Sequence, residues 1–122
     1  MENEQNQIIP NIDLDTNKRR FIRHPVCIPL EFVREDDKKT KEKAETVNLS
    51  LGGLLFLSRK RIAPESVIIV SLPFRDKVFK VHGKVARCDK DESSKLYHVG
   101  IEFVKISDAF KVRLVEQLHL IE

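Results

Sequence analysis

The chain has few cysteines and no long hydrophobic run. None of its apolar stretches approaches the length of a membrane-spanning helix, and residues 1–10 are polar, so we expect neither membrane insertion nor a secretory signal. The only cysteines, Cys27 and Cys88, fall in strand-like patterns, where a thiol acts as a small apolar residue. The sequence leaves a disulfide between neighbouring strands open, but it favours two reduced thiols in a cytoplasmic protein.

The chain also lacks a strong excess of charge, with a formal net charge of only +3. Nonspecific binders of nucleic acid polymers usually carry a larger positive excess, because their affinity rises with the number of phosphates neutralised. We therefore expect no nucleic acid polymer as a partner, and a local basic cluster would suit a small anionic ligand. With 122 residues, 41% hydrophobic and 34% charged, the chain has the size and composition of one soluble domain.

The residue patterns of an enzyme or a metal site are missing as well. The sequence contains no phosphate-binding P-loop, no Ser-His-Asp arrangement and no pair of catalytic acids. His24 and Cys27 have a spacing that metal ligands use, yet no second pair completes a tetrahedral site. His82, His98 and His119 stand in strand or helix patterns without a nucleophile beside them. We predict a protein that is not an enzyme and has no metal or cofactor.

Residues 1–17 differ in composition from the rest of the chain. They are rich in Asn, Gln, Asp and Glu, and their few aliphatic residues are Ile8, Ile9, Ile12 and Leu14. This is too little apolar surface to bury, so we predict a flexible tail before one domain over residues 18–122. The alternative is a short docking segment that uses these four aliphatic residues.

Six stretches have the alternating or continuously apolar pattern of β-strands. They cover residues 26–33, 44–48, 54–58, 67–72, 78–87 and 96–104. The fourth is apolar throughout, which predicts a well-buried strand that ends at Pro73. Residues 34–43 are almost wholly charged, with both signs mixed, and predict an exposed hairpin loop.

After the last strand the apolar period changes to that of a helix. Ser107 is a good N-cap, Asp108 suits the positive helix end, and apolar residues follow at helical spacing. These are Phe110, Leu114, Leu118 and Ile121. The sequence thus predicts an all-β fold with a terminal helix, a six-stranded antiparallel β-barrel whose open side or end is covered by a C-terminal α-helix.

Arg19, Arg20 and Arg23 lie in a basic run directly before the first predicted strand. A guanidinium is planar and always charged, so it grips phosphate oxygens through two parallel hydrogen bonds. It also stacks on purines or contacts the O6 and N7 acceptors of guanine. Arginines four residues apart on a mobile segment can therefore wrap a ligand that carries phosphates and purines. Taken alone, this run is better explained as a solvated basic linker.

Asn48, Ser50 and the Gly52-Gly53 pair form a second polar segment between two strands. An Asn side chain both accepts and donates hydrogen bonds, and Ser50 points to the same side of an extended strand. Glycines without a Cβ permit a positive φ and a close approach of the backbone to a ligand. Taken alone, this segment is better explained as a β-turn capped by Asn and Ser.

Together, Arg19-xxx-Arg23 and Asn48-x-Ser50-xx-Gly53 resemble the paired signature of PilZ domains, the bacterial receptors for cyclic di-GMP. Asn48 fills a position where the family has Asp or Asn. The strand over residues 26–33, the Gly-Gly-Leu-Leu-Phe-Leu segment and residues 99–103 are also similar to the family. The resemblance covers the chain from residue 18 to the C-terminus.

The resemblance implies a six-stranded barrel with a C-terminal helix and a site for one or two molecules of cyclic di-GMP. Arg19 and Arg23 would close over the ligand, Asn48 and Ser50 would contact a guanine, and Gly53 would allow the approach. Arg20 is expected as a further contact. Arg87, on a later strand, is by default an ordinary exposed arginine.

Ligand binding would order the arginine segment and so signal to an effector protein that the sequence does not identify. Two alternatives stay open: a small basic barrel that binds RNA or single-stranded DNA through exposed aromatic residues, and a PilZ-like adaptor that acts without a ligand. The oligomeric state, monomer or dimer, and the ligand stoichiometry also stay open.

Overall fold

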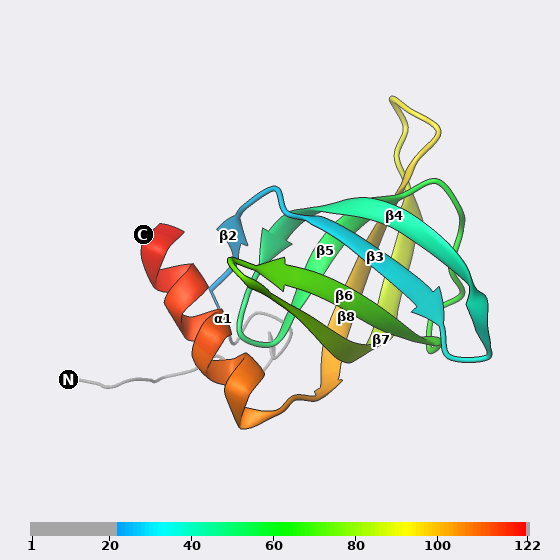
Figure 1. The fold of residues 1–122 in the computed structure, drawn as a ribbon. Coiled ribbons are helices and arrows are strands. Elements are labelled where there is room, and N and C mark those ends of the chain that lie inside the picture. Colours follow the sequence, from blue (N-terminus) through cyan, green and yellow to red (C-terminus); the bar gives the residue numbers. More distant parts are fainter. Residues whose placement is uncertain (1–21, 122) are drawn as a thin grey trace.

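The computed structural model describes residues 22–121 (Figure 1). Their elements follow one another along the chain as β2 (His24–Pro25), β3 (Pro29–Arg34), β4 (Asp37–Leu49), β5 (Gly53–Ser58), β6 (Val67–Phe74), β7 (Lys77–Lys90), β8 (Tyr97–Lys105) and α1 (Asp108–Ile121). Within this range no helix is long and apolar enough to cross a membrane. The predicted tail, Arg19 and Arg20 lie outside the described residues.

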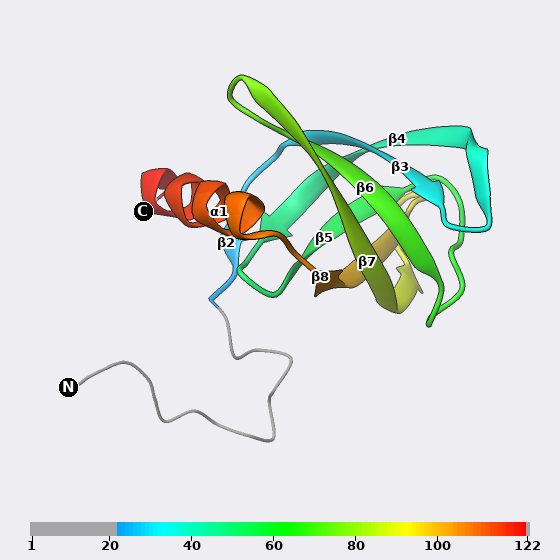
Figure 2. The same ribbon diagram turned by 60° about the horizontal axis from the view of Figure 1, so that its bottom comes forward.

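Six of the strands close into an antiparallel barrel. The pairing runs β4-β3-β6-β7-β8-β5, and a further pairing between β5 and β4 completes the ring. The short β2 adds to β4 as an outer strand, with Pro25 opposite Asn48. Figures 1 and 2 show α1 lying across one end of this barrel. The predicted fold, a six-stranded antiparallel barrel with a C-terminal helix, is confirmed.

The barrel interior is filled by the inward-facing half of each strand. Along β6 the buried residues alternate with partly exposed ones, and Ile68, Val70 and Leu72 are fully buried. On β7, Phe79, Val81 and Val85 face inward. Burial of large aliphatic and aromatic side chains is the main force that stabilises such a barrel.

The helix packs on the barrel through Phe110, Leu114 and Leu118, which are buried in the same hydrophobic core. The Phe110 backbone N–H donates to the Ser107 hydroxyl at 3.1 Å, which confirms the predicted N-cap. The buried Phe110 ring stacks on Phe74 at 5.7 Å between centroids and meets Phe79 and Phe103 edge-on at 5.5 and 5.4 Å. These aromatic contacts orient α1 over the barrel end.

The prediction of a loop over residues 34–43 was wrong. Only Glu35 and Asp36 form the turn, and β4 begins at Asp37. Arg34 pairs with Asp37 and Phe32 with Glu42, so backbone hydrogen bonds to β3 hold this charged segment extended. Most of its side chains are exposed, which is why a strand here tolerates charge on both faces.

Three other predicted features of the strands also differ. Pro73 does not end β6 but lies within it, opposite Val78, and β3 pairs with β6 only as far as Ser71. The missing N–H of Pro73 therefore breaks no ladder to β3. The strand is also not buried on both faces, as its continuous apolar run predicted, since the outward-facing Val67 and Ile69 are only partly buried.

The first predicted strand begins at Pro29 rather than Val26, so Cys27 lies outside a strand, where it is exposed. Both cysteines are free.

Candidate functional site

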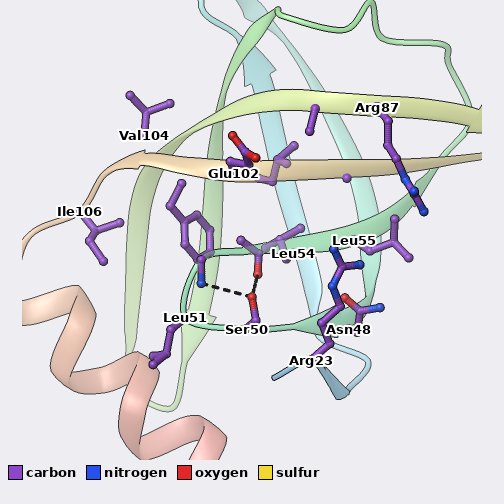
Figure 3. Close-up of a pocket in the computed structure, with 16 residues that line it drawn as sticks. Arg23, Asn48, Ser50, Leu51, Leu54, Leu55, Arg87, Glu102, Val104 and Ile106 are labelled. Atoms are coloured by element: carbon purple, nitrogen blue, oxygen red, sulfur yellow. Dashed lines mark hydrogen bonds between the residues drawn. The ribbon is translucent and has the colours of Figure 1, made fainter. Parts of the chain in front are cut away.

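A pocket of about 520 Å³ lies on the outer face of the barrel where β5, β7 and β8 meet the turn after β4 (Figure 3). Its polar and charged lining residues are Arg23, Asn48, Ser50, Arg87 and Glu102. Its apolar residues include Leu51, Leu54, Leu55, Phe103, Val104 and Ile106. The pocket thus combines cationic and amide groups with an apolar floor, which suits a ligand that carries both charge and flat rings.

Arg23 reaches this pocket because β2 pairs with β4. Pro25 lies opposite Asn48 in the antiparallel register, which places the residue before His24 beside the end of β4. In Figure 3 the Arg23 and Asn48 side chains lie next to each other. Arg23 is exposed, and no carboxylate of residues 22–121 forms an ion pair with it. Its guanidinium therefore keeps its donors for a ligand.

Thr46 fixes the segment that follows Arg23. Its buried hydroxyl donates to the Val26 carbonyl at 2.6 Å and accepts from the Ile28 N–H at 2.8 Å. The Thr46 N–H donates in turn to the Ile28 carbonyl at 3.0 Å. These bonds satisfy buried backbone groups of an irregular stretch and hold it against β4.

The floor of the pocket is one row of outward-facing residues across four strands. Asn48 of β4 pairs with Leu55 of β5, Leu55 with Gly100 of β8, and Gly100 with Arg87 of β7. A Cβ at Gly100 would lie 3.6 Å from Arg87 Cγ and 3.8 Å from Leu55 Cδ1, so the missing side chain leaves a shallow space between the two. The row offers an apolar surface with an amide at one end and a guanidinium at the other.

The Ser50 hydroxyl is used by the turn itself. It donates to the Gly53 carbonyl at 3.2 Å and accepts from the Gly52 N–H at 3.2 Å (Figure 3), and the residue is 8% exposed. The Ser50 N–H also donates to the Gly53 carbonyl, at 2.9 Å. Ser50 lines the pocket, and its hydrogen bonds are those of the turn-capping alternative considered from the sequence.

Gly52 and Gly53 do not use the positive φ that glycine permits, since no glycine in residues 22–121 has one. Gly53 is required for a different reason. A Cβ there would collide with the backbone carbonyl of Ile101 on β8. The Phe103 N–H donates to the Gly52 carbonyl at 2.9 Å, which ties the same turn to β8. Gly53 thus allows β5 and β8 to pack closely directly under the pocket.

Of the six residues predicted for the site, the structure brings four to one pocket: Arg23, Asn48, Ser50 and Gly53. Sequence reasoning missed Glu102 and left Arg87 as an ordinary surface residue. Strict alternation from Val85 would turn Arg87 inward. A register shift between Val85 and Arg87 turns it outward instead. A bulge of this kind has no sequence signature here, so only the pairing reveals it.

Metal-ligating side chains are scattered over the described part of the chain. Among residues 22–121, no three His, Cys, Asp or Glu side chains gather as a group that could hold a metal ion. His98 on β8 contacts Asp91, in the turn between β7 and β8, at 3.1 Å, away from the pocket.

The family model of the PilZ domain matches residues 17–119. The chain belongs to the PilZ domain family. No curated protein matches the sequence.

Solved structures of other proteins share the fold. The PilZ domain of Escherichia coli YcgR, solved with c-di-GMP, has a TM-score of 0.65 at 14% identity, over 86% of this chain and 92% of that one. The Bacillus subtilis inhibitor of motility MotI/DgrA has a TM-score of 0.67 at 14% identity, over 83% of this chain and 49% of that one. The K. pneumonia MrkH–c-di-GMP complex has a TM-score of 0.61 at 15% identity, over 84% and 50%.

Proposed function

We propose that this protein is a receptor for cyclic di-GMP that passes ligand binding to a protein partner. The observation that carries the proposal is the convergence of Arg23 and Asn48, 25 positions apart in the sequence, on one pocket whose floor ends at Arg87. Two guanidinium groups can neutralise the two phosphates of a cyclic dinucleotide, while the apolar floor accepts a purine face.

Each site residue has a proposed role. Arg23 binds a phosphate or stacks on a base, and Asn48 contacts a guanine edge through its amide. Ser50 shapes the turn, with its hydroxyl close to the ligand. Gly53 keeps the pocket floor in place. Arg19 and Arg20 precede Arg23 on the same segment, and we propose that they complete the grip on the ligand.

The signalling step is the ordering of residues 19–23 against the hydrogen-bonded turn over residues 50–53. A ligand that binds the ordered arrangement more tightly shifts the population toward it, and a partner can then bind the new surface. The c-di-GMP bound to the PilZ domain of E. coli YcgR supports a receptor for this ligand, and the name of MotI, an inhibitor of motility, supports a regulatory output. Because cyclic di-GMP is an intracellular messenger, the proposed receptor acts in the cytoplasm. Its proposed role is to bind this ligand, not to catalyse a reaction.

A barrel that binds RNA or single-stranded DNA is less well supported. Such barrels use exposed aromatic side chains as stacking surfaces. Over residues 22–121 the phenylalanines are buried or packed against the core: Phe32, Phe56, Phe74, Phe79, Phe103 and Phe110.

Titration calorimetry of the full chain with cyclic di-GMP tests the proposal. We expect saturable binding in the micromolar range or below, equivalent to about −8 kcal/mol or more favourable. GMP, which has one base and one phosphate, should bind far more weakly. The absence of binding heat at tens of micromolar protein, roughly ten times a micromolar dissociation constant, would refute the receptor function. It would leave the ligand-independent adaptor.

A further inference from the structure

Glu102 is an acidic residue in a pocket whose proposed ligand is an anion. It lies on β8, paired with Gly53 on one side and with Lys84 of β7 on the other. Its side chain is exposed and lines the same pocket as Arg23 and Asn48 (Figure 3). Because a carboxylate repels phosphate groups, attraction to the charge of the ligand cannot explain this residue.

The neighbouring lysine, Lys84, forms its ion pair with a different carboxylate. The Lys84 ammonium lies 2.9 Å from a carboxylate oxygen of Glu65. The hydrogen bond to Glu65 is the main cause that raises the pKa of Lys84, followed by the charge of Glu65, and the charge of Glu102 contributes least. No cation of residues 22–121 lies within 4.0 Å of the Glu102 carboxylate. The carboxylate is therefore open to a ligand.

A carboxylate recognises a particular arrangement of donors. It only accepts hydrogen bonds, through two oxygens. The Watson–Crick edge of guanine presents two adjacent donors, N1–H and the 2-amino group, whereas adenine presents its 6-amino donor beside an acceptor nitrogen. We infer that Glu102 accepts hydrogen bonds from N1–H and the 2-amino group of one guanine and thereby selects guanine over adenine dinucleotides. This inference rests on the proposed function, cyclic di-GMP binding.

The position of Glu102 on the barrel fits this role. On β8 it is the next outward-facing residue after Gly100, which forms part of the apolar floor. A purine that lies on this floor presents its edge to Glu102. The strand β5 separates Glu102 from the Asn48 strand β4, so the two side chains approach a ligand from different sides. Glu102 and Asn48 can therefore contact different edges or different bases.

Calorimetry with three cyclic dinucleotides tests the inference. The probes are cyclic di-GMP, cyclic di-IMP, which lacks only the 2-amino groups, and cyclic di-AMP. The proteins are the wild type, Glu102→Ala, Glu102→Gln and the control Glu116→Ala, which removes an exposed carboxylate of α1 outside the pocket. Because Glu102 is exposed on a strand, these variants are expected to fold, and a thermal melt checks that they do.

The wild type should bind cyclic di-GMP about tenfold or more tightly than cyclic di-IMP, because a bidentate contact to a base edge discriminates against the wrong base by about this factor. In Glu102→Ala this ratio should fall toward one, and Glu102→Gln should lie between. Glu116→Ala should keep the wild-type ratio.

Unchanged or tighter binding of cyclic di-GMP to Glu102→Ala, with the wild-type ratio preserved, would overturn the role of Glu102 while leaving the receptor function intact. No binding of any probe to the wild type would overturn both.

Discussion

The α-carbon of Gly53 lies so close to the Ile101 carbonyl that any side chain at this position would collide with the backbone of β8. The last glycine of the PilZ-like segment is therefore a packing residue of the barrel as well as a lining residue of the pocket. The strand pair that it joins, β5 with β8, carries both Leu55 and Glu102.

Gly53→Ala should therefore destabilise the protein itself. The added methyl group must push β5 away from β8, and such overpacking costs about 1–3 kcal/mol. Urea denaturation measures this loss. Gly100→Ala is the matched control, since its Cβ would meet only ordinary contacts at 3.6 and 3.8 Å. Equal stability of Gly53→Ala and the wild type would contradict the close approach.

Arg23→Ala should weaken cyclic di-GMP binding without changing stability, because Arg23 is exposed and forms no ion pair with residues 22–121. Loss of hydrogen bonds to a charged group predicts a change of about 10- to 100-fold in the dissociation constant. Arg23→Lys should restore little, since an ammonium neither stacks nor forms bidentate bonds.

Calorimetry measures the dissociation constants of the Arg23 variants, with Arg59→Ala, exposed and outside the pocket, as the control. Wild-type affinity in Arg23→Ala would show that Arg23 does not contact the ligand.

Thr46→Val should loosen the segment that carries Arg23. Valine has nearly the shape of threonine but leaves the Val26 carbonyl and the Ile28 N–H without their hydroxyl partner. A buried unsatisfied group costs about 1–3 kcal/mol, so the free energy of unfolding should fall by that order. Amide hydrogen exchange at Ile28 should also accelerate. Unchanged protection of this amide would mean that the hydroxyl does not hold the segment.

Acid should weaken the turn between β7 and β8 through Asp91. Hydrogen bonds lower the pKa of Asp91 to about 2, that from Ser94 first, then those from His98 and Ser93. In the unfolded chain the pKa is about 3.9. The ionised carboxylate therefore stabilises the turn above about pH 4, and this contribution disappears as the pH falls through about 2.

NMR titration of the Asp91 carboxyl carbon checks this pH dependence. In Asp91→Asn the amide of residue 91, which donates to the Leu96 carbonyl at 2.8 Å, should exchange faster at neutral pH. A midpoint near 4 for Asp91 would show that these hydrogen bonds do not form in solution.

The sequence predicted the strands whose apolar residues alternate and the helix whose N-cap and spacing are regular. Residues 34–43 were wrongly predicted as a loop, because the pattern of side chains does not show where backbone hydrogen bonds to a neighbouring strand hold a segment extended. The β3–β4 ladder keeps this charged segment extended, although its side chains bury almost no apolar surface. Pro73 was misassigned for a related reason, since whether a proline breaks a ladder depends on the partner strand at that position.

For the site, the sequence by itself determined the chemistry: which segments carry guanidinium, amide and bare glycine, and in which order. Only the tertiary structure decided how they meet. The β2–β4 pairing brings Arg23 to Asn48, and the bulge before Arg87 turns its side chain outward. Strand register likewise places Glu102 in the pocket. Because side chains alternate along a strand, the sequence of one strand shows which residues share a face. Register and bulges depend on contacts between strands, and the sequence of one segment does not encode these contacts.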